Sequence, residues 1–412
     1  MPSKSGNSIF VIERIKGLRT TKQFDVFLFA GVLAITAIGY YFLYIVSPTL
    51  PESINVDLMM RRQLISIFIG VVAALVLACF DYKYFRVPSY VAYIFSIILL
   101  CWVLKFGFGD TSWGSRSWMS LPVIGNFQPA EITKITFVVV ISTFYERIAL
   151  KTAEKIDYFK LVLYSFLPII LVLKQGDTGT AIVFLFIFCF MTFASGIKYR
   201  YVLIAGASAL VSLPLLWFFY LSDYQKMRFM TFLNPELDKL GKGLQVIRSK
   251  TAISAGQLFG RQIENVAQAE FAKVPARSTD FIFTVIAEKV GFVGSALFVI
   301  LIVFVMLRCF YIASKAKDHY GSFMVVGLAS MMLFHNIENI GMCLGIVPVT
   351  GIPLPFVSQG GTAMITNYIA IGIILSVSMM REKTYYRQNE ANNVVGAPKS
   401  DNISIQMSSN HW

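Results

Sequence analysis

About ten long apolar runs follow one another along the chain, and they limit its fold more than any other feature of the sequence. A transmembrane helix needs about 20 consecutive apolar residues, and most of the runs approach or exceed that length. The chain is only 14% charged, whereas a soluble domain is usually about 25% charged. The sequence therefore predicts an all-α polytopic membrane protein with about ten transmembrane helices, and it argues against a soluble protein with a very large core. The runs span 26–46, 63–80, 88–104, 131–145, 159–173, 179–196, 201–221, 281–307, 321–341 and 363–380.

The distribution of Lys and Arg predicts the orientation of these helices, because short cytoplasmic loops carry an excess of both residues. With the N-terminus placed inside, the inner segments hold many more basic residues than the short outer loops. We therefore expect both termini in the cytoplasm, and the loops rich in Gly, Pro and Trp on the outer face. Chemistry or binding is expected on that face. The basic residues of the short outer loops are Arg61, Arg62, Lys105, Arg116 and Lys174.

The same analysis divides the chain into three parts. Residues 1–25 are predicted to form a cytoplasmic N-terminal segment, and residues 26–382 a transmembrane domain. Within that domain, residues 222–280 form a large extracytoplasmic loop between helices 7 and 8. The polar stretch 383–412, rich in Asn and Ser, is expected to be a disordered cytoplasmic tail.

Charge and cysteine usage limit the partners. A net charge of +13 would suggest nucleic acid for a soluble protein, but here it reflects loop charge that sets topology, so the expected partner is the lipid bilayer and no nucleic acid. The five cysteines contain no C-x-x-C pair and the three histidines are scattered, so no zinc site with His or Cys ligand spacing is visible.

Two polar motifs stand at predicted outer helix ends. In the first, Glu131 and Lys134 lie three residues apart near the start of an apolar helix, shortly after Trp118. They could simply form an ion pair, but ionisable residues inside a membrane also suggest function. In the second, Asp177 follows Lys174 in a glycine-containing turn, where it could cap the next helix or serve the site.

A third motif begins where the long outer loop ends. Asp280 lies at or near the start of an apolar helix, where the helix dipole stabilises its anion. It could be an N-cap, or a general base held at the membrane surface. Glu288 lies about two turns deeper beside Lys289, and the two are candidates for a buried ion pair.

The fourth motif, residues 345–362, contains three prolines and four glycines among mostly apolar residues, and Ser358 near its end. Non-helical backbone at membrane depth must be buried in protein or line a watery cavity. This segment is therefore predicted to be re-entrant or to line a cavity.

Five stretches of the chain resemble the SEDS family of shape, elongation, division and sporulation proteins (RodA, FtsW and SpoVE). The resemblance covers residues 25–382 and is specific, because the stretches occur in the family's order on helices of the expected polarity. The stretches read GSRSWMSLPVIGNFQPAEITKI, QGDTGTA, YQKMRFMTFLNPELDKLGKGLQVIRSKTAISAG, STDFIFTVIAEKVGFVG and GIVPVTGIPLPFVSQGG.

The resemblance implies a peptidoglycan glycosyltransferase that polymerises lipid II at the outer face of the bacterial cytoplasmic (inner) membrane, in elongation, division or sporulation. It implies a class B penicillin-binding protein, a transpeptidase, as partner. The Ser117–Trp118 pair favours the rod-shape branch. The family's catalytic carboxylate corresponds to Asp280. Matching positions with supporting roles are held by Trp118, Glu131, Lys134, Asp177 and Arg228.

Four positions depart from the family pattern. Ser278 stands where the family commonly has His, and Lys289 where it commonly has Glu. Gln359 replaces a common Tyr, and Gly176 a common Pro. Each departure could tune or weaken the activity, and the retained Asp280 leads us to expect an active enzyme.

The expected mechanism needs one base and a source of positive charge. Asp280 would take a proton from the acceptor hydroxyl, and cations would offset the charge of the departing pyrophosphate. The candidates for this charge are Arg116, Lys174, Arg228 and Arg248, or a bound Mg²⁺. Two other functions are open: a flippase or transporter for the lipid-linked precursor, and a non-catalytic scaffold of a cell-wall synthesis complex.

Small residues in the ninth apolar run suggest a surface for the partner's membrane helix. Helices pack closely in lipid where small residues allow their backbones to approach. The ninth run offers Gly321, Gly327, Ala329 and Ser330, so we expect the partner helix to dock there.

Overall fold

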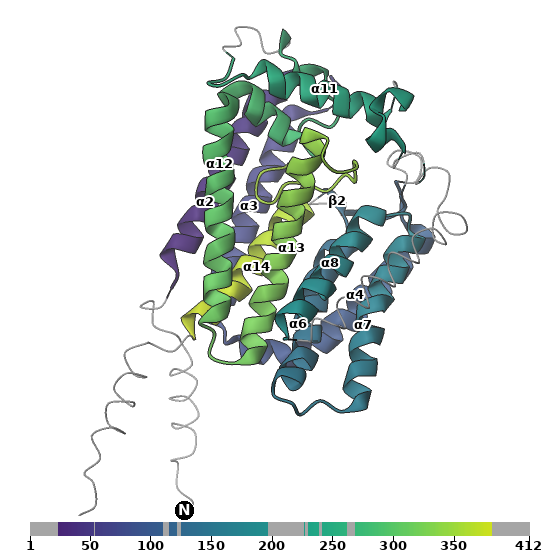
Figure 1. Ribbon diagram of the computed structural model, residues 1–412, viewed down its shortest axis with the longest axis vertical. Helices are drawn as coiled ribbons and strands as arrows, with labels where there is room; N and C mark the ends of the chain where they lie inside the picture. Colours follow the sequence, from purple (N-terminus) through teal and green to yellow (C-terminus); the bar gives the residue numbers. More distant parts are fainter. Residues whose placement is uncertain are drawn as a thin grey trace, which may run out of the picture.

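Helices make up almost all of the structure and run between two opposite ends of the molecule (Figure 1). This computed structural model describes residues 24–52, 54–109, 115–121, 125–196, 226, 230–238, 241–261 and 268–380. Its helices are α2 (Val26–Val46), α3 (Val56–Cys79), α4 (Arg86–Phe106), α6 (Pro129–Ala149), α7 (Lys155–Lys174), α8 (Thr178–Ala194), α11 (Lys242–Ala255), α12 (Ile282–Ser314), α13 (His319–Leu344) and α14 (Gly361–Met379). Short 3₁₀ turns are η2 (Ser47–Thr49), η3 (Tyr82–Phe85), η4 (Pro235–Asp238) and η6 (Phe271–Lys273), and a small antiparallel hairpin joins β1 (Met119–Leu121) to β2 (Gly125–Phe127).

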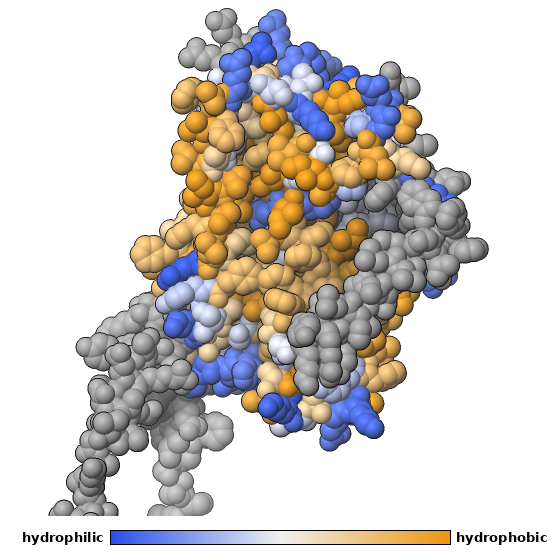
Figure 2. All heavy atoms as spheres, in the orientation of Figure 1, coloured by the Kyte–Doolittle hydropathy of each residue, from blue (hydrophilic) through white to orange (hydrophobic). Residues whose placement is uncertain are grey.

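The apolar character of these helices matches that of a membrane protein. Seven of the described helices are long and apolar enough to cross a membrane, and α8 is a shorter apolar helix. A broad apolar band lies between two polar ends in Figure 2. Nine of the ten predicted runs coincide with α2, α3, α4, α6, α7, α8, α12, α13 and α14. The predicted run 201–221, nearly all of segment 1–25 and all of segment 383–412 lie outside the described residues.

The helix ends define two faces. We call the end that carries α11 the outer end; the links α4–α6, α7–α8 and α13–α14 lie there too (Figure 1). The links α3–α4, α6–α7 and α12–α13, with the start of α2 and the end of α14, lie at the opposite, inner end (Figure 1). The described spans therefore alternate in direction as the predicted topology requires, and which end faces the cell exterior stays a prediction.

Two helices form the centre of the bundle. In the most apolar stretches of α13 and α14, 78% and 83% of the residues are buried. In the corresponding stretches of α3 and α4, only 28% of the residues are buried. A Cβ at Gly327 on α13 would lie 2.5 Å from Val138 Cγ1 on α6 and 2.7 Å from Met191 Sδ on α8. The predicted docking face on α13 is therefore wrong, because other helices of the same chain already cover it.

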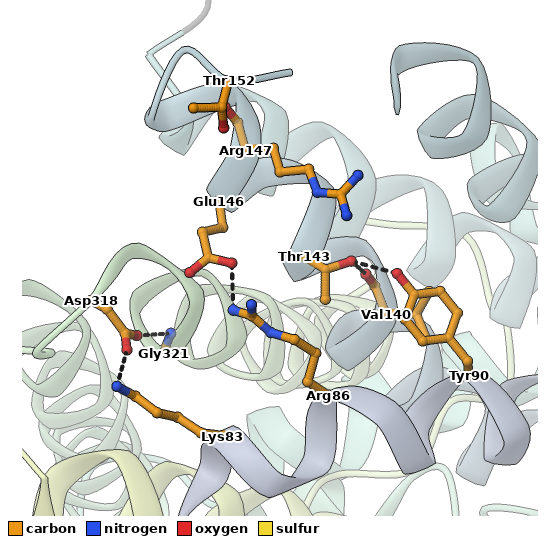
Figure 3. Close-up of polar contacts among 10 residues, drawn as sticks. All are labelled: Lys83, Arg86, Tyr90, Val140, Thr143, Glu146, Arg147, Thr152, Asp318 and Gly321. Atoms are coloured by element: carbon orange, nitrogen blue, oxygen red, sulfur yellow. Dashed lines mark hydrogen bonds and ion pairs between the residues drawn. The ribbon is translucent and has the colours of Figure 1, made fainter. Parts of the chain in front are cut away.

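Ion pairs connect the helices at the inner end (Figure 3). Lys83 in η3 contacts Asp318, which caps α13, with 3.2 Å between Nζ and Oδ2. Arg86 at the start of α4 donates to Glu146 of α6, and its guanidinium lies 4.5 Å from the ring centroid of Tyr320. These contacts join the inner ends of α4, α6 and α13. Two of the basic residues that predict the orientation, Lys83 and Arg86, are therefore paired here.

A kink divides α12 near its outer end. Gly291 has a φ of 69°, which interrupts the helical backbone and which L residues rarely adopt. The segment after α11 supplies partners for the interrupted turn: Phe292 N donates to Gln257 O at 2.8 Å and Arg261 N to Glu288 O at 3.0 Å. The segment after α11 is therefore packed onto the outer part of α12, and Asp280 lies two residues before this helix begins.

Candidate active site at the outer end

Asp280 lies two residues before α12, at the outer end of the bundle and half-buried. The N-cap of α12 is Phe281, so the interpretation of Asp280 as the N-cap is wrong. Its carboxylate faces the fourth motif: a Cβ on Gly351 would lie 3.3 Å from Asp280 Oδ2. Gly351 has a φ of 81°, which only glycine adopts easily, so this position keeps the backbone close to the carboxylate.

Three consecutive backbone carbonyls around Asp280 are each held by a distant part of the chain. Ser278 O accepts from Gln359 N at 2.9 Å. Thr279 O accepts from Ser358 Oγ at 2.5 Å, and Asp280 O from Asn339 Nδ2 at 2.8 Å. The loop that carries Asp280 is thus fixed by the fourth motif and by α13.

Two further contacts join this loop to the first helices of the chain. Arg277, in the loop, donates to the carbonyl and hydroxyl oxygens of Thr49 in η2, which follows α2, and burial lowers the pKa of the Arg277 guanidinium. Gln63 of α3 donates to Ser358 O at 3.3 Å and accepts from Gly360 N at 3.2 Å. The sequence analysis did not identify Gln63. Its only signal in the sequence is a polar residue at the start of an apolar run.

The first, second and fourth motifs meet beside the third. Asp177 caps α8, accepting from Thr180 N at 3.0 Å, as the capping interpretation predicts. Its other oxygen accepts from Gln128 Nε2 at 2.7 Å, which connects the first motif to the second. A Cβ at Gly179 would lie 3.0 Å from Thr350 Cβ, so the second motif packs on the residue beside Gly351. Four motifs separated in sequence are therefore assembled at one end.

A buried ion pair and a histidine lie together on the helices behind the site. Lys134 Nζ is 2.9 Å from Glu131 Oε1 and 3.0 Å from His335 Nε2 of α13, and all three residues are at most 4% exposed. The predicted ion pair is confirmed, and His335 is an additional partner. A lysine ammonium has only donors, so His335 Nε2 accepts and the ring carries its proton on Nδ1. A second carboxylate oxygen, Glu131 Oε2, is buried with no partner among the described atoms.

Two predicted site residues have structural partners. Glu288 is fully buried and accepts from Glu270 N at 2.9 Å and from Phe271 N at 2.6 Å. The predicted ion pair with Lys289 is therefore wrong, because backbone amides of the outer loop occupy the carboxylate. Arg248 of α11 is half-buried and donates to Lys273 O at 2.6 Å, within the same loop.

The predicted cations lie at the outer end, but only some are described. Arg116 N donates to Gln175 O at 2.9 Å, so exposed Arg116 lies beside exposed Lys174 at the end of α7. Trp118 is half-buried and forms a backbone bridge with Phe108. Arg228 lies outside the described residues.

Helix α13 contributes polar residues that the sequence analysis missed. His335, Glu338 and Asn339 are buried near its outer end, and each contacts another element. Glu338 accepts from Thr350 Oγ1 at 2.8 Å. Asn336, between them, instead donates to Met332 O within α13. The signal in the sequence is a group of polar residues in an apolar run, which in a membrane helix points to function.

No group of three His, Cys, Asp or Glu side chains that could hold a metal ion occurs among the described residues. Mg²⁺ is often held by one or two carboxylates together with substrate phosphates, so a bound Mg²⁺ stays a prediction.

The fold and these four motifs define an α-helical, multi-pass membrane protein with its polar site at the outer end of the bundle. The chain matches the FtsW/RodA/SpoVE family, described as cell cycle proteins, over residues 25–383. It belongs to this family, whose members are multi-pass proteins of the bacterial cytoplasmic membrane.

Relatives with curated names support the assignment. The chain is 37% identical over 324 residues to "Peptidoglycan glycosyltransferase MrdB" of Escherichia coli (strain K12), covering 79% of this chain and 86% of that one. It is 32% identical over 367 residues to "Probable peptidoglycan glycosyltransferase FtsW" of Trichlorobacter lovleyi, covering 86% and 93%. It is 33% identical over 322 residues to "Stage V sporulation protein E" of Bacillus subtilis (strain 168), covering 77% and 86%.

Solved structures share the fold. A chain from the work described as "Structural coordination of polymerization and crosslinking by a peptidoglycan synthase complex" superposes with a TM-score of 0.72, at 28% identity, and covers 86% of this chain and 97% of that one. Rod shape determining protein RodA of Thermus thermophilus gives a TM-score of 0.64 at 26% identity, covering 87% and 98%.

Proposed function

We propose that this peptidoglycan glycosyltransferase uses Asp280 as the general base that joins two lipid-linked disaccharides. The enzyme class rests on the family and on the names of its relatives. The observation that carries the role of Asp280 is its position: a half-buried carboxylate at the outer end, in a loop whose three successive carbonyls are fixed by other elements. Fixed placement is what a general base requires, since efficient proton transfer depends on geometry.

The reaction balances with a single carboxylate. The Asp280 carboxylate takes the proton of the acceptor hydroxyl as that oxygen attacks the anomeric carbon of the donor sugar. A new carbon–oxygen bond forms, and the bond from the anomeric carbon to polyprenyl pyrophosphate breaks, with its electron pair leaving on the pyrophosphate. One-step displacement inverts the anomeric centre, so an α-linked donor gives a β-linked glycan. No general acid is needed, because pyrophosphate is a good leaving group.

The pyrophosphate requires positive charge near the outer surface. Arg116 and Lys174 are the described candidates, because both are exposed and their segments are joined by the Arg116–Gln175 backbone hydrogen bond. We assign Arg248 a structural contribution to the outer loop, because its guanidinium already binds Lys273 O. The proposed substrate is lipid II, and its polyprenyl chain would lie along the apolar side of the bundle.

We also propose a class B penicillin-binding protein as the partner. The similar structure with a TM-score of 0.72 comes from a complex described as coordinating polymerization and crosslinking. The partner's outer domain would press on the loop that ends at Asp280, whose described part packs on α12. Its membrane helix must use a surface other than the buried face of α13 around Gly327.

The alternatives receive less support. The polar motifs are gathered at the outer end, whereas a transporter also needs a polar path at the inner end. The described residues at that end are joined by ion pairs. A scaffold would not need a carboxylate held in a fixed loop.

The test is polymerisation of labelled lipid II by the purified full chain, alone and with its transpeptidase partner. Asp280→Asn should abolish glycan formation in a chain that still folds. Asp57→Asn, which removes an exposed carboxylate at the start of α3, also at the outer end, should leave the rate unchanged. Polymerisation at the normal rate by well-folded Asp280→Asn protein would refute the role of Asp280 as base.

A further inference from the structure

Asn339 of α13 lies directly behind Asp280 and uses both of its amide hydrogens on the site. Asn339 Nδ2 donates to Asp280 O at 2.8 Å and to Ile352 O at 2.8 Å. The side chain is 0% exposed. Both partners are carbonyl oxygens, so only the NH₂ end of the amide can face them, which fixes the orientation of the side chain.

The peptide bond that follows Asp280 is held on both sides. Its carbonyl accepts from Asn339, and its N–H, that of Phe281, donates to Ala276 O at 3.1 Å. Rotation of this peptide would move the Cα–Cβ bond of Asp280 and therefore its carboxylate. Asn339 also donates to the carbonyl of Ile352. Ile352 directly follows Gly351, which faces the Asp280 carboxylate.

The arrangement is costly for folding, which argues against a role in stability alone. Asn339 Oδ1 is buried and has no partner among the described atoms. An unpaired buried acceptor destabilises a fold, because the group loses its hydrogen bonds to water without gaining a partner. An apolar side chain at this position would avoid that cost but could not donate to the two carbonyls.

We propose that Asn339 is a positioning residue that sets the placement of the Asp280 carboxylate for proton transfer. The inference rests on the proposed function of Asp280. In this role Asn339 does not touch substrate; it acts through the peptide bond after Asp280 and through the loop at Ile352.

A neighbouring residue provides a matched control. Asn336 lies one turn earlier on the same helix, is 6% exposed, and donates from Nδ2 to Met332 O at 2.8 Å within α13. The same substitution at Asn336 and Asn339 therefore changes a buried amide on one helix, with contact to the Asp280 loop in only one case.

The experiment measures kcat and KM for lipid II polymerisation by the full chain carrying Asn339→Leu or Asn336→Leu. Misplacing a catalytic group by about 1 Å can cost roughly 100-fold in rate. We therefore expect Asn339→Leu to lower kcat by about 10- to 100-fold with KM changed less than about twofold, whereas Asn336→Leu changes kcat by less than about threefold. Asn339→Asp keeps the volume but, when ionised, cannot donate, so it covers the case in which the leucine variant does not fold.

A second readout follows the peptide itself. Hydrogen exchange of residues 276–284 should become about tenfold faster in Asn339→Leu and Asn339→Asp than in Asn336→Leu, because only the Asn339 variants lose the hydrogen bond to Asp280 O. Folded Asn339 variants with a normal kcat and normal exchange would overturn the inference. Equal losses of kcat in the Asn336 and Asn339 variants would also overturn it, since both substitutions would then act through disturbed packing of α13. The proposed function would survive either result if Asp280→Asn remained inactive.

Discussion

Replacing Gly351 with alanine tests the geometry of the site with a single added methyl group. A Cβ at this position would lie 3.3 Å from Asp280 Oδ2, which is close enough that the carboxylate must shift by a few tenths of an ångström. The substitution also places an L residue at a φ of 81°, which costs about 1–2 kcal/mol. The first effect acts on catalysis and the second on stability.

Gly196 separates the two effects. It has a φ of 76°, so alanine there carries a similar backbone cost, but no described atom lies within 4 Å of the point that its Cβ would occupy. Gly196 follows α8 at the inner end, away from Asp280. Both variants should therefore lose about 1–2 kcal/mol of stability, and only Gly351→Ala should move the carboxylate.

The expected loss of rate follows from the displacement. If about 1 Å costs roughly 100-fold, a shift of a few tenths should lower kcat about 3- to 10-fold. Gly196→Ala should change kcat by less than about twofold. The assay is lipid II polymerisation with matched amounts of folded protein, with thermal unfolding of both variants as the stability measurement. Equal polymerisation rates for the two variants would refute the reasoning that the Asp280 carboxylate must keep its present position.

Three further predictions follow from buried partners and from topology. Glu288→Ala leaves two backbone N–H groups unpaired, so thermal unfolding should show a loss of roughly 2–4 kcal/mol, and Glu288→Gln, which keeps one acceptor, should lose less. Lys134→Met leaves the buried Glu131 carboxylate without its cation, so the free energy of unfolding should fall by about 3–5 kcal/mol. Adding Glu131→Gln should restore part of that stability. A double variant that is no more stable than Lys134→Met would contradict the pairing. A single cysteine at exposed Leu258 should react with a membrane-impermeant reagent in intact cells and one at Lys317 only after permeabilisation, and the reverse pattern would overturn the orientation.

The sequence by itself determined which segments form long apolar helices. A span must be long and apolar because unpaired backbone groups are costly in lipid, and this requirement is visible in any window of about 20 residues. All nine apolar runs that the structure describes became helices, although α3 begins at Val56 and α12 ends at Ser314, each seven residues beyond the predicted bound. The Asp177 cap and the Glu131–Lys134 pair were also predictable, because both interactions join residues three positions apart.

The contacts that build the site were decided only by the tertiary structure. Asn339, Gln63 and His335 act on residues far away in sequence, and no local pattern indicates their partners. Glu288 likewise binds amides some 17 or 18 residues away, instead of the adjacent Lys289.

The error about the face of α13 has the same origin. In water, an apolar stripe on a helix shows which side is buried, but in lipid the side facing lipid and the side facing protein are both apolar. Small residues such as Gly327 indicate close packing without showing whether the neighbour belongs to the same chain. Here α6 and α8 supply that neighbour, and only the packed bundle reveals it.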